Sequence, residues 1–219
     1  MGNDTQFRGV ITDWGGVLTS PILATVRAWI EADDIDWNSY RTVMKSWVSQ
    51  AYNGEADPNP IHALERGECS GTDFERILAA RLFRIDGGAV AAEGLLQRMF
   101  AASVPVPAMY DLIRALRGAG LRTALLSNSW GCDEYPRADF PGLFDAVVIS
   151  GEVGMRKPEE GIFLHAAQAL GLAPAECVFI DDMAANVAAA VGCGMTGVLH
   201  NEAESTAAAL HDLLGASAS

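Results

Sequence analysis

Carboxylate side chains follow two apolar, strand-like runs of this sequence. Asp13 ends the first run and is followed at once by the turn residues Gly15 and Gly16. A carboxylate at the end of a buried strand can attack an electrophile or hold a metal ion, and glycines let the backbone approach a ligand closely. The adjacent pair Asp181 and Asp182 ends the second run, where a divalent cation would relieve the repulsion between neighbouring acids. Asp13 alone is also compatible with ordinary turn chemistry, so its role depends on the residues that join it.

Two further polar positions follow apolar runs. Ser127 and Asn128 come after the run 121–126, and Lys157 follows the run 146–149 and a short loop. Because the carboxyl ends of parallel strands meet at one edge of a sheet, we expect these side chains to share a crevice with the acidic residues. Taken singly, Ser127 could equally cap the segment after it, and Lys157 could be a solvated loop lysine.

The spacing of apolar residues predicts alternating strands and helices on either side of a purely helical region. Strands are expected at 10–12, 121–126, 146–149, 177–180 and 195–199. Helices between the later strands imply parallel pairing, so the expected fold class is α/β, a doubly wound parallel sheet formed by residues 1–19 and 104–219. Residues 20–103 show helical patterns alone, which predicts an inserted helical cap. Within this cap, Thr72 and Glu75 predict a capping box at the start of a helix.

Length and composition indicate a folded globular protein. With 219 residues and 50% hydrophobic content, the chain suffices for one domain plus a sizeable insertion. Its formal net charge of −13 argues against nucleic acid or an anionic membrane as a partner, because both need clustered cations. The four cysteines form no Cys-x-x-Cys pair and the N-terminus has no export signal pattern, so a cytoplasmic protein is expected. The oligomeric state stays open, a homodimer included.

Four motifs, in order along the chain, resemble those of the haloacid dehalogenase (HAD) superfamily of hydrolases. They are Asp13-Trp-Gly-Gly-Val-Leu, Leu126-Ser-Asn-Ser-Trp, Gly154-Met-Arg-Lys-Pro-Glu and Phe179-Ile-Asp-Asp with Asn186. The resemblance covers nearly the whole chain, because the helical region 20–103 is similar to the small cap of that superfamily. It points to the branch that holds sugar-phosphate phosphatases and the N-terminal phosphatase domain of soluble epoxide hydrolase. It implies a HAD-like, Rossmann-like core.

The resemblance implies covalent phosphoryl transfer to Asp13. This residue would attack phosphorus to form an aspartyl-phosphate. Ser127 and the backbone beside Asn128 would hold the transferring phosphoryl oxygens. Lys157 would pair with both Asp13 and the phosphoryl group, which offsets negative charge as it builds.

The resemblance also implies a Mg²⁺ site, with one departure from the family pattern. Asp13, Asp182 and the backbone carbonyl of Gly15 would bind the ion, with Asp181 as a direct or water-mediated helper. The usual pattern places a second Asp, the general acid and base, two positions after the nucleophile, where this chain has Gly15. General acid–base help is typically worth about 10²–10⁴ in rate, so its loss weakens the expected catalysis.

Three hypotheses for the function follow. The leading one is a Mg²⁺-dependent phosphomonoesterase that acts through an aspartyl-phosphate on a small phosphorylated metabolite. The second, raised by Gly15, is a HAD-like binding or regulatory protein with weakened or lost catalysis. The third is a 2-haloacid dehalogenase. Such an enzyme needs no metal, so Asp181 and Asp182 beside a carboxylate nucleophile argue against it.

Overall fold

The computed structural model describes residues 7–52, 59–131 and 135–216, and the chain divides into two compact units. Within the described residues, the first unit contains 7–20, 104–128 and 135–216, and the second contains 21–52, 59–103 and 129–131. The chain leaves the first unit after Ser20 and returns at Val104, where the Ser20 N–H donates to the Val104 carbonyl at 2.8 Å.

A five-stranded parallel sheet with the order β3-β2-β1-β4-β5 forms the centre of the first unit. Its strands are β1 (Gly9–Thr12), β2 (Arg122–Ser127), β3 (Ala146–Ile149), β4 (Cys177–Asp181) and β5 (Thr196–Leu199). β1 is the central strand and pairs with β2 and β4, so Thr12 lies opposite Leu125 on one side and Ile180 on the other. This sheet confirms the predicted α/β fold class, a doubly wound parallel sheet.

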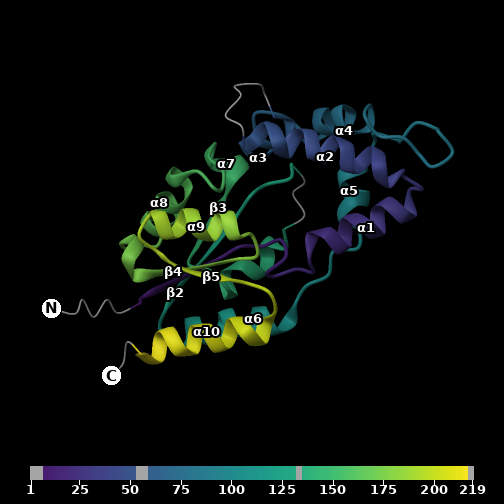
Figure 1. The fold of residues 1–219 in the computed structure, drawn as a ribbon. Helices are drawn as coiled ribbons and strands as arrows, with labels where there is room; N and C mark the ends of the chain where they lie inside the picture. Colours follow the sequence, from purple (N-terminus) through teal and green to yellow (C-terminus); the bar gives the residue numbers. More distant parts are fainter. Residues whose placement is uncertain (1–6, 53–58, 132–134, 217–219) are drawn as a thin grey trace. The chain divides into compact units, whose positions relative to one another are not determined.

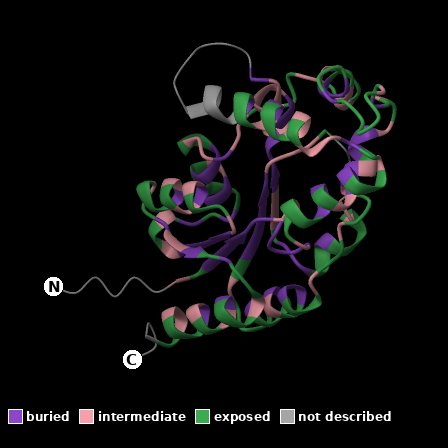
Figure 2. Cartoon of the chain, turned by 45° about the vertical axis from the view of Figure 1, so that its right-hand side comes forward, coloured by how far each residue is buried: buried purple, intermediate pink, exposed green. Residues whose placement is uncertain are grey.

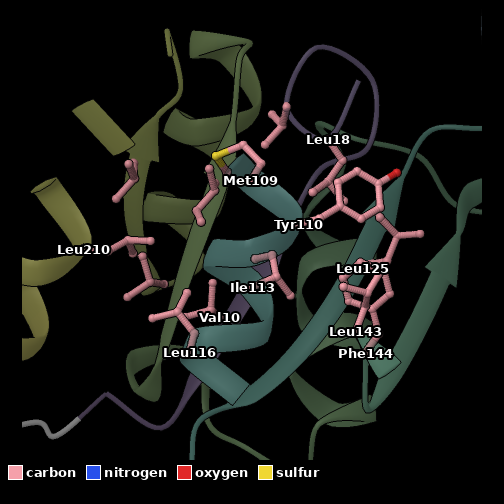
Figure 3. Close-up of a cluster of buried hydrophobic side chains, with 14 of the residues drawn as sticks. Val10, Leu18, Met109, Tyr110, Ile113, Leu116, Leu125, Leu143, Phe144 and Leu210 are labelled. Atoms are coloured by element: carbon pink, nitrogen blue, oxygen red, sulfur yellow. The ribbon is translucent and has the colours of Figure 1, made fainter. Parts of the chain in front are cut away.

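Helices cover both faces of the sheet (Figure 1). α6 (Pro107–Gly118) and α10 (Ala203–Ala216) pack on one face, and α8 (Glu160–Ala169) and α9 (Ala184–Gly192) pack on the other. Successive strand residues point to opposite faces, so Val10 joins the cluster under α6 whereas Ile11 joins the cluster under α8. The cluster on the α6 face is drawn in Figure 3.

The strands are buried because helices cover both of their faces. Every residue of β1 and β4 is buried, as the purple strands of Figure 2 show. Such strands lack polar alternation, which explains why they appear in the sequence as continuous apolar runs. Val178, Phe179 and Ile180 of β4 are 0% exposed, and burying side chains of this kind contributes roughly 1.5–3 kcal/mol each.

Short elements complete the first unit. They are α7 (Ser150–Val153) and two 3-10 turns, η1 (Arg137–Gly142) and η2 (Pro174–Glu176). Within the described residues of the whole chain, no helix combines the length and hydropathy that crossing a bilayer requires. Cys69, Cys177 and Cys193 are free thiols, and Cys132 lies outside the described residues.

The second unit is helical around its own hydrophobic cluster. Its helices are α1 (Ile22–Ala32), α2 (Trp37–Tyr52), α3 (Pro60–Glu65), α4 (Gly71–Ala79) and α5 (Leu95–Phe100). Trp29, Phe74 and Leu78 are among its fully buried side chains. Residues 129–131 also belong to this unit, and the Trp130 ring meets Phe74 edge-on at 6.3 Å between centroids. In sequence these three residues fall within the range 104–219 predicted for the α/β core.

The predicted capping box at the start of α4 is wrong by two residues. Ser70 is the N-cap and its side chain accepts the Asp73 N–H at 3.1 Å, so Thr72 lies inside the helix. Glu75 accepts the backbone N–H of Leu96 at 3.0 Å instead of returning to the helix start. Two overlapping Ser/Thr-x-x-acid patterns occur here, Ser70 with Asp73 and Thr72 with Glu75. Because Glu75 bonds to Leu96, only the first pattern caps the helix.

Candidate active site

The polar residues predicted to act together follow strands of the first unit. Asp13 comes directly after β1, Ser127 is the last residue of β2, and Asp181 is the last residue of β4. Lys157 lies in the turn between α7 and α8. Because β1, β2 and β4 are neighbouring parallel strands, these positions lie at one edge of the sheet.

Lys157 is buried between two carboxylates. Its Nζ lies 2.7 Å from Oδ1 of Asp13 and 2.7 Å from Oδ2 of Asp181, and its side chain is 2% exposed. Burial opposes the charged form of a lysine, but the two carboxylates outweigh that effect and raise the Lys157 pKa above its ordinary value. The ammonium group is therefore a fixed positive charge directly beside Asp13.

Asp13 is held in place and has a perturbed pKa. Its Oδ1 accepts the backbone N–H of Trp14 at 2.7 Å in addition to the Lys157 ammonium. Burial raises the pKa of Asp13 to about 7; the charge of Asp181 adds to this rise, whereas Lys157 and the Trp14 amide oppose it. Because Asp13 is buried next to a second acid, a cation bound nearby would favour its ionised form over its protonated form.

Asp181 is surrounded by donors. Its Oδ1 accepts the Met183 N–H at 2.8 Å and the Asn186 amide at 3.0 Å. Its Oδ2 accepts Lys157 at 2.7 Å and the same Asn186 amide at 3.1 Å. Asp181 is 0% exposed and both of its oxygens accept hydrogen bonds, so it fixes the position of the Lys157 ammonium.

Asp182 completes a group of three acids. Asp13, Asp181 and Asp182 each offer a carboxylate oxygen, and the three oxygens lie within 4.8 Å of one another. Burial and the neighbouring Asp181 raise the pKa of Asp182, while Lys157 acts in the opposite sense. Clustered oxygen donors of this kind suit a hard divalent cation such as Mg²⁺.

Gly16 is packed against this acidic group. It adopts φ +79°, and a Cβ atom added there would stand 2.2 Å from Oδ2 of Asp182. A glycine is required both for the left-handed backbone and for the close approach of the carboxylate. Gly15, by contrast, lies outside the left-handed region and contributes only backbone atoms.

Asn128 acts on Lys157 through the backbone. Its Oδ1 accepts the Lys157 N–H at 2.8 Å, and its Nδ2 donates to the Lys157 carbonyl at 3.1 Å. The side chain thereby joins the end of β2 to the turn that carries the lysine, 29 residues further along the chain. The structure thus brings Asn128, Lys157, Asp13 and Asp181 into one hydrogen-bonded chain.

Ser127 has a partner that no sequence pattern indicates. Its Oγ lies 2.9 Å from the hydroxyl of Tyr135, and the Tyr135 ring lies 5.5 Å from the Trp14 ring in an edge-on contact. The sequence around Tyr135 has no hydrophobic periodicity, so no sequence signal places this residue beside Ser127. The aromatic pattern around Trp14 is visible only in the fold.

A buried aspartate follows the central strand of a parallel sheet, a buried lysine lies beside it, and further acids follow the neighbouring strand. This arrangement is typical of hydrolases that have an α/β core and a carboxylate nucleophile. Residues 7–194 match the family model described as haloacid dehalogenase-like hydrolase. The chain belongs to this family, as its motifs predicted.

Individual relatives differ in how much of their length corresponds to this chain. Sesquiterpene phosphatase astK of Aspergillus oryzae is 26% identical over 216 residues, covering 96% of this chain and 98% of its own length. Mouse acyl-CoA dehydrogenase family member 10 is 28% identical over 216 residues, but this chain spans only 19% of its length. A HAD-family enzyme from Bacteroides thetaiotaomicron, solved with magnesium and inorganic phosphate, is 20% identical with a TM-score of 0.59. That alignment covers 89% of this chain and 94% of the Bacteroides chain.

Proposed function

We propose that this protein is a Mg²⁺-dependent phosphomonoesterase that acts through an aspartyl-phosphate on a small phosphorylated metabolite. The observation that carries the proposal is the buried Asp13 held by Lys157 and grouped with two more carboxylates at the carboxyl edge of the sheet. The family membership and the similarity to a phosphatase over nearly the full length of both chains support it.

In the proposed reaction, Asp13 is the nucleophile. Among the described residues, Trp14 and Lys157 both reach its Oδ1, so we assign the attack on phosphorus to Oδ2. A bond forms between this oxygen and phosphorus as the bond from phosphorus to the leaving oxygen breaks, and the leaving group departs as an oxyanion that takes a proton from water. Water then hydrolyses the aspartyl-phosphate, which releases inorganic phosphate and restores the carboxylate.

Three residues hold the phosphoryl group in this proposal. The Ser127 hydroxyl and the backbone beside Asn128 bind its oxygens. The Lys157 ammonium stabilises the charge on phosphoryl and nucleophile together, and its place is set in advance by Asp181 and Asn128. Donors that are already oriented need no reorganisation during the reaction, which makes their stabilisation large.

The donor set fits a magnesium ion. We assign Asp13, Asp182 and the carbonyl of Gly15 as its ligands, whereas Asp181 acts mainly through Lys157 because both of its oxygens are engaged. When bound, Mg²⁺ neutralises phosphoryl charge and relieves the repulsion between the acids. Inorganic phosphate with Mg²⁺, the pair bound by the Bacteroides enzyme, is the natural first probe.

Gly15 supports a second candidate function. The family's usual acid is missing at this position, so a protein that binds a phosphorylated ligand without turning it over would have the same geometry. The proposal of a phosphatase rests on the nucleophile, lysine and acids being assembled. The second candidate rests on the missing proton donor.

A substrate screen separates these functions. The parent protein and Asp13→Asn are assayed against phosphorylated metabolites with and without Mg²⁺, with a 2-haloacid as a further substrate. The proposal predicts Mg²⁺-dependent phosphate release that Asp13→Asn lowers at least about 10³-fold, because the amide is not nucleophilic. Phosphate binding without release supports the binding protein. Metal-independent halide release overturns both.

A further inference from the structure

Tyr135 contacts both the turn after β1, which carries the proposed nucleophile, and the end of β2, which carries the proposed phosphoryl-binding serine. Its hydroxyl lies 2.9 Å from Ser127 Oγ. Its ring meets Trp14 edge-on at 5.5 Å, and the backbone N–H of Trp14 donates to Asp13 Oδ1 at 2.7 Å. A single side chain therefore contacts the serine through its oxygen and the Asp13 loop through its ring.

The Tyr135 hydroxyl is held by its surroundings. The ring lies 6.3 Å from Phe140, and the Arg137 guanidinium lies 5.9 Å above the ring centroid. Ser127 itself is buried, with 3% exposure. A ring fixed on several sides presents its hydroxyl at one position, so the contact with Ser127 requires little further loss of side-chain freedom.

The direction of this hydrogen bond decides what Ser127 can do. A serine hydroxyl has one hydrogen, and binding a phosphoryl oxygen requires that hydrogen to point at the ligand. Ser127 Oγ donates to the Asn128 carbonyl over a long 3.5 Å contact. If Tyr135 donates to Ser127 Oγ, the serine hydrogen can turn from this weak contact to the ligand; if Ser127 donates to Tyr135, it cannot. The phenol is the more acidic of the two hydroxyls and therefore the better donor, and donation into Oγ strengthens the next bond in the chain.

We propose that Tyr135 is a positioning residue that orients the Ser127 hydroxyl toward the transferring phosphoryl group. The inference rests on the proposed phosphatase function and adds to it a residue that the family motifs do not include. Tyr135 acts through Ser127 and does not touch the reacting atoms in this proposal.

Tyr110 offers a matched control. Its ring also meets Trp14 edge-on, at 6.1 Å, and Figure 3 labels it among the side chains of the cluster on the α6 face. Within the described residues, Ser127 Oγ bonds to Tyr135 and to the Asn128 carbonyl, so the Tyr110 hydroxyl has no part in this arrangement. Tyr110→Phe and Tyr135→Phe each remove one oxygen from the same aromatic cluster.

The test is a double-mutant cycle with Tyr135→Phe and Ser127→Ala. Steady-state kinetics of the Mg²⁺-loaded protein should show kcat/KM about 3- to 10-fold lower for Tyr135→Phe, the size of one oriented hydrogen bond. Calorimetric binding of inorganic phosphate in Mg²⁺ should weaken by a similar factor. In the Ser127→Ala background, Tyr135→Phe should have no further effect on either quantity.

Several results would overturn the inference. An equal loss in Tyr110→Phe, or a loss from Tyr135→Phe that persists in the Ser127→Ala background, would assign the effect to packing around Trp14. Parent-like kinetics and phosphate binding in Tyr135→Phe would remove the role of the hydroxyl. A parent protein that neither binds phosphate nor hydrolyses any phosphate ester would instead contradict the proposed function, and the inference with it.

Discussion

Gly16 lies directly against the carboxylate of Asp182, and a methyl group at Gly16 would stand 2.2 Å from Asp182 Oδ2. The glycine therefore sets the position of an acid that we assign to the metal site. Its left-handed backbone, with φ +79°, keeps Cα close to the carboxylate while the turn after β1 closes.

The first prediction is that Gly16→Ala removes Mg²⁺ binding. The added methyl must displace Asp182, so the rise of the melting temperature on adding Mg²⁺ should disappear. Gly154→Ala is the control, because Gly154 has a similar φ of +68° but nothing within 4 Å of an added Cβ. Both variants should lose about 1–2 kcal/mol from the left-handed alanine, but only Gly154→Ala should keep the Mg²⁺ effect. A normal Mg²⁺ effect in Gly16→Ala would place the metal elsewhere.

The second prediction concerns the charges around Lys157. Lys157→Met leaves Asp13 and Asp181 buried without their shared cation, which should lower the free energy of unfolding by about 3–5 kcal/mol. Asp181→Asn removes one of the two uncompensated charges, so it should cost less in the Lys157→Met background than in the parent. Urea unfolding of the four proteins measures this coupling. Strictly additive losses would show that the three charges do not act as a unit.

The third prediction is a pH dependence that arises away from the active site. Burial alone would raise the pKa of the Asp145 carboxyl, but the Thr123 amide at 2.9 Å and the Arg117 guanidinium at 2.9 Å lower it overall. A lowered pKa in the folded protein means that the ionised group stabilises the fold above its ordinary pKa, and that this stability is lost as pH falls toward the lowered value.

Asp145→Asn should therefore destabilise the protein at pH 7 and have a diminishing effect in acid. The side chain is 33% exposed, so solvent screening limits the loss to about 0.5–1 kcal/mol. Asp111→Asn is the control, because Asp111 pairs with Arg114 on α6 but is 75% exposed. Unfolding free energies between pH 7 and pH 3 test the prediction. A difference between Asp145→Asn and the parent that stays constant over this range would contradict it.

Much of the fold was predictable because buried parallel strands appear in the sequence as continuous apolar runs. The apolar runs at β2 and β4 end within one residue of the predicted limits, and both end in polar residues. The rule that parallel strands share a carboxyl edge then explains why Asp13 and Asp181, far apart in the chain, meet at Lys157.

Other features depend on contacts that sequence patterns do not encode. Asn128 reaches the Lys157 backbone across 29 residues, and Tyr135 reaches Ser127 from an irregular segment. Trp130, the last residue of the motif that carries Ser127, packs on Phe100 and Phe74 of the helical unit. Hydrophobic periodicity reports which face of a regular element is buried, so residues outside regular elements give no comparable signal.

The last prediction concerns Gly15, where the family's proton donor is missing. Departure of an alkoxide needs a proton, whereas an aryl, acyl or anomeric phosphate has a leaving group stable enough to depart with less help. In the parent, log kcat/KM should therefore fall steeply as the pKa of the leaving group rises. Gly15 lies outside the left-handed region, so Gly15→Asp is compatible with the backbone and should reduce this slope.

The gain from Gly15→Asp should be largest for primary alkyl phosphates and reach up to about 10²-fold, the lower end of what general acid catalysis contributes. Gly15→Ala separates the carboxyl group from the added bulk, since alanine keeps the carbonyl assigned to the metal but donates no proton. Rates over a series of aryl and alkyl phosphates, measured for all three proteins, give the slopes. If the parent already has a shallow slope equal to that of Gly15→Asp, another residue donates the proton, and Gly15 does not limit catalysis.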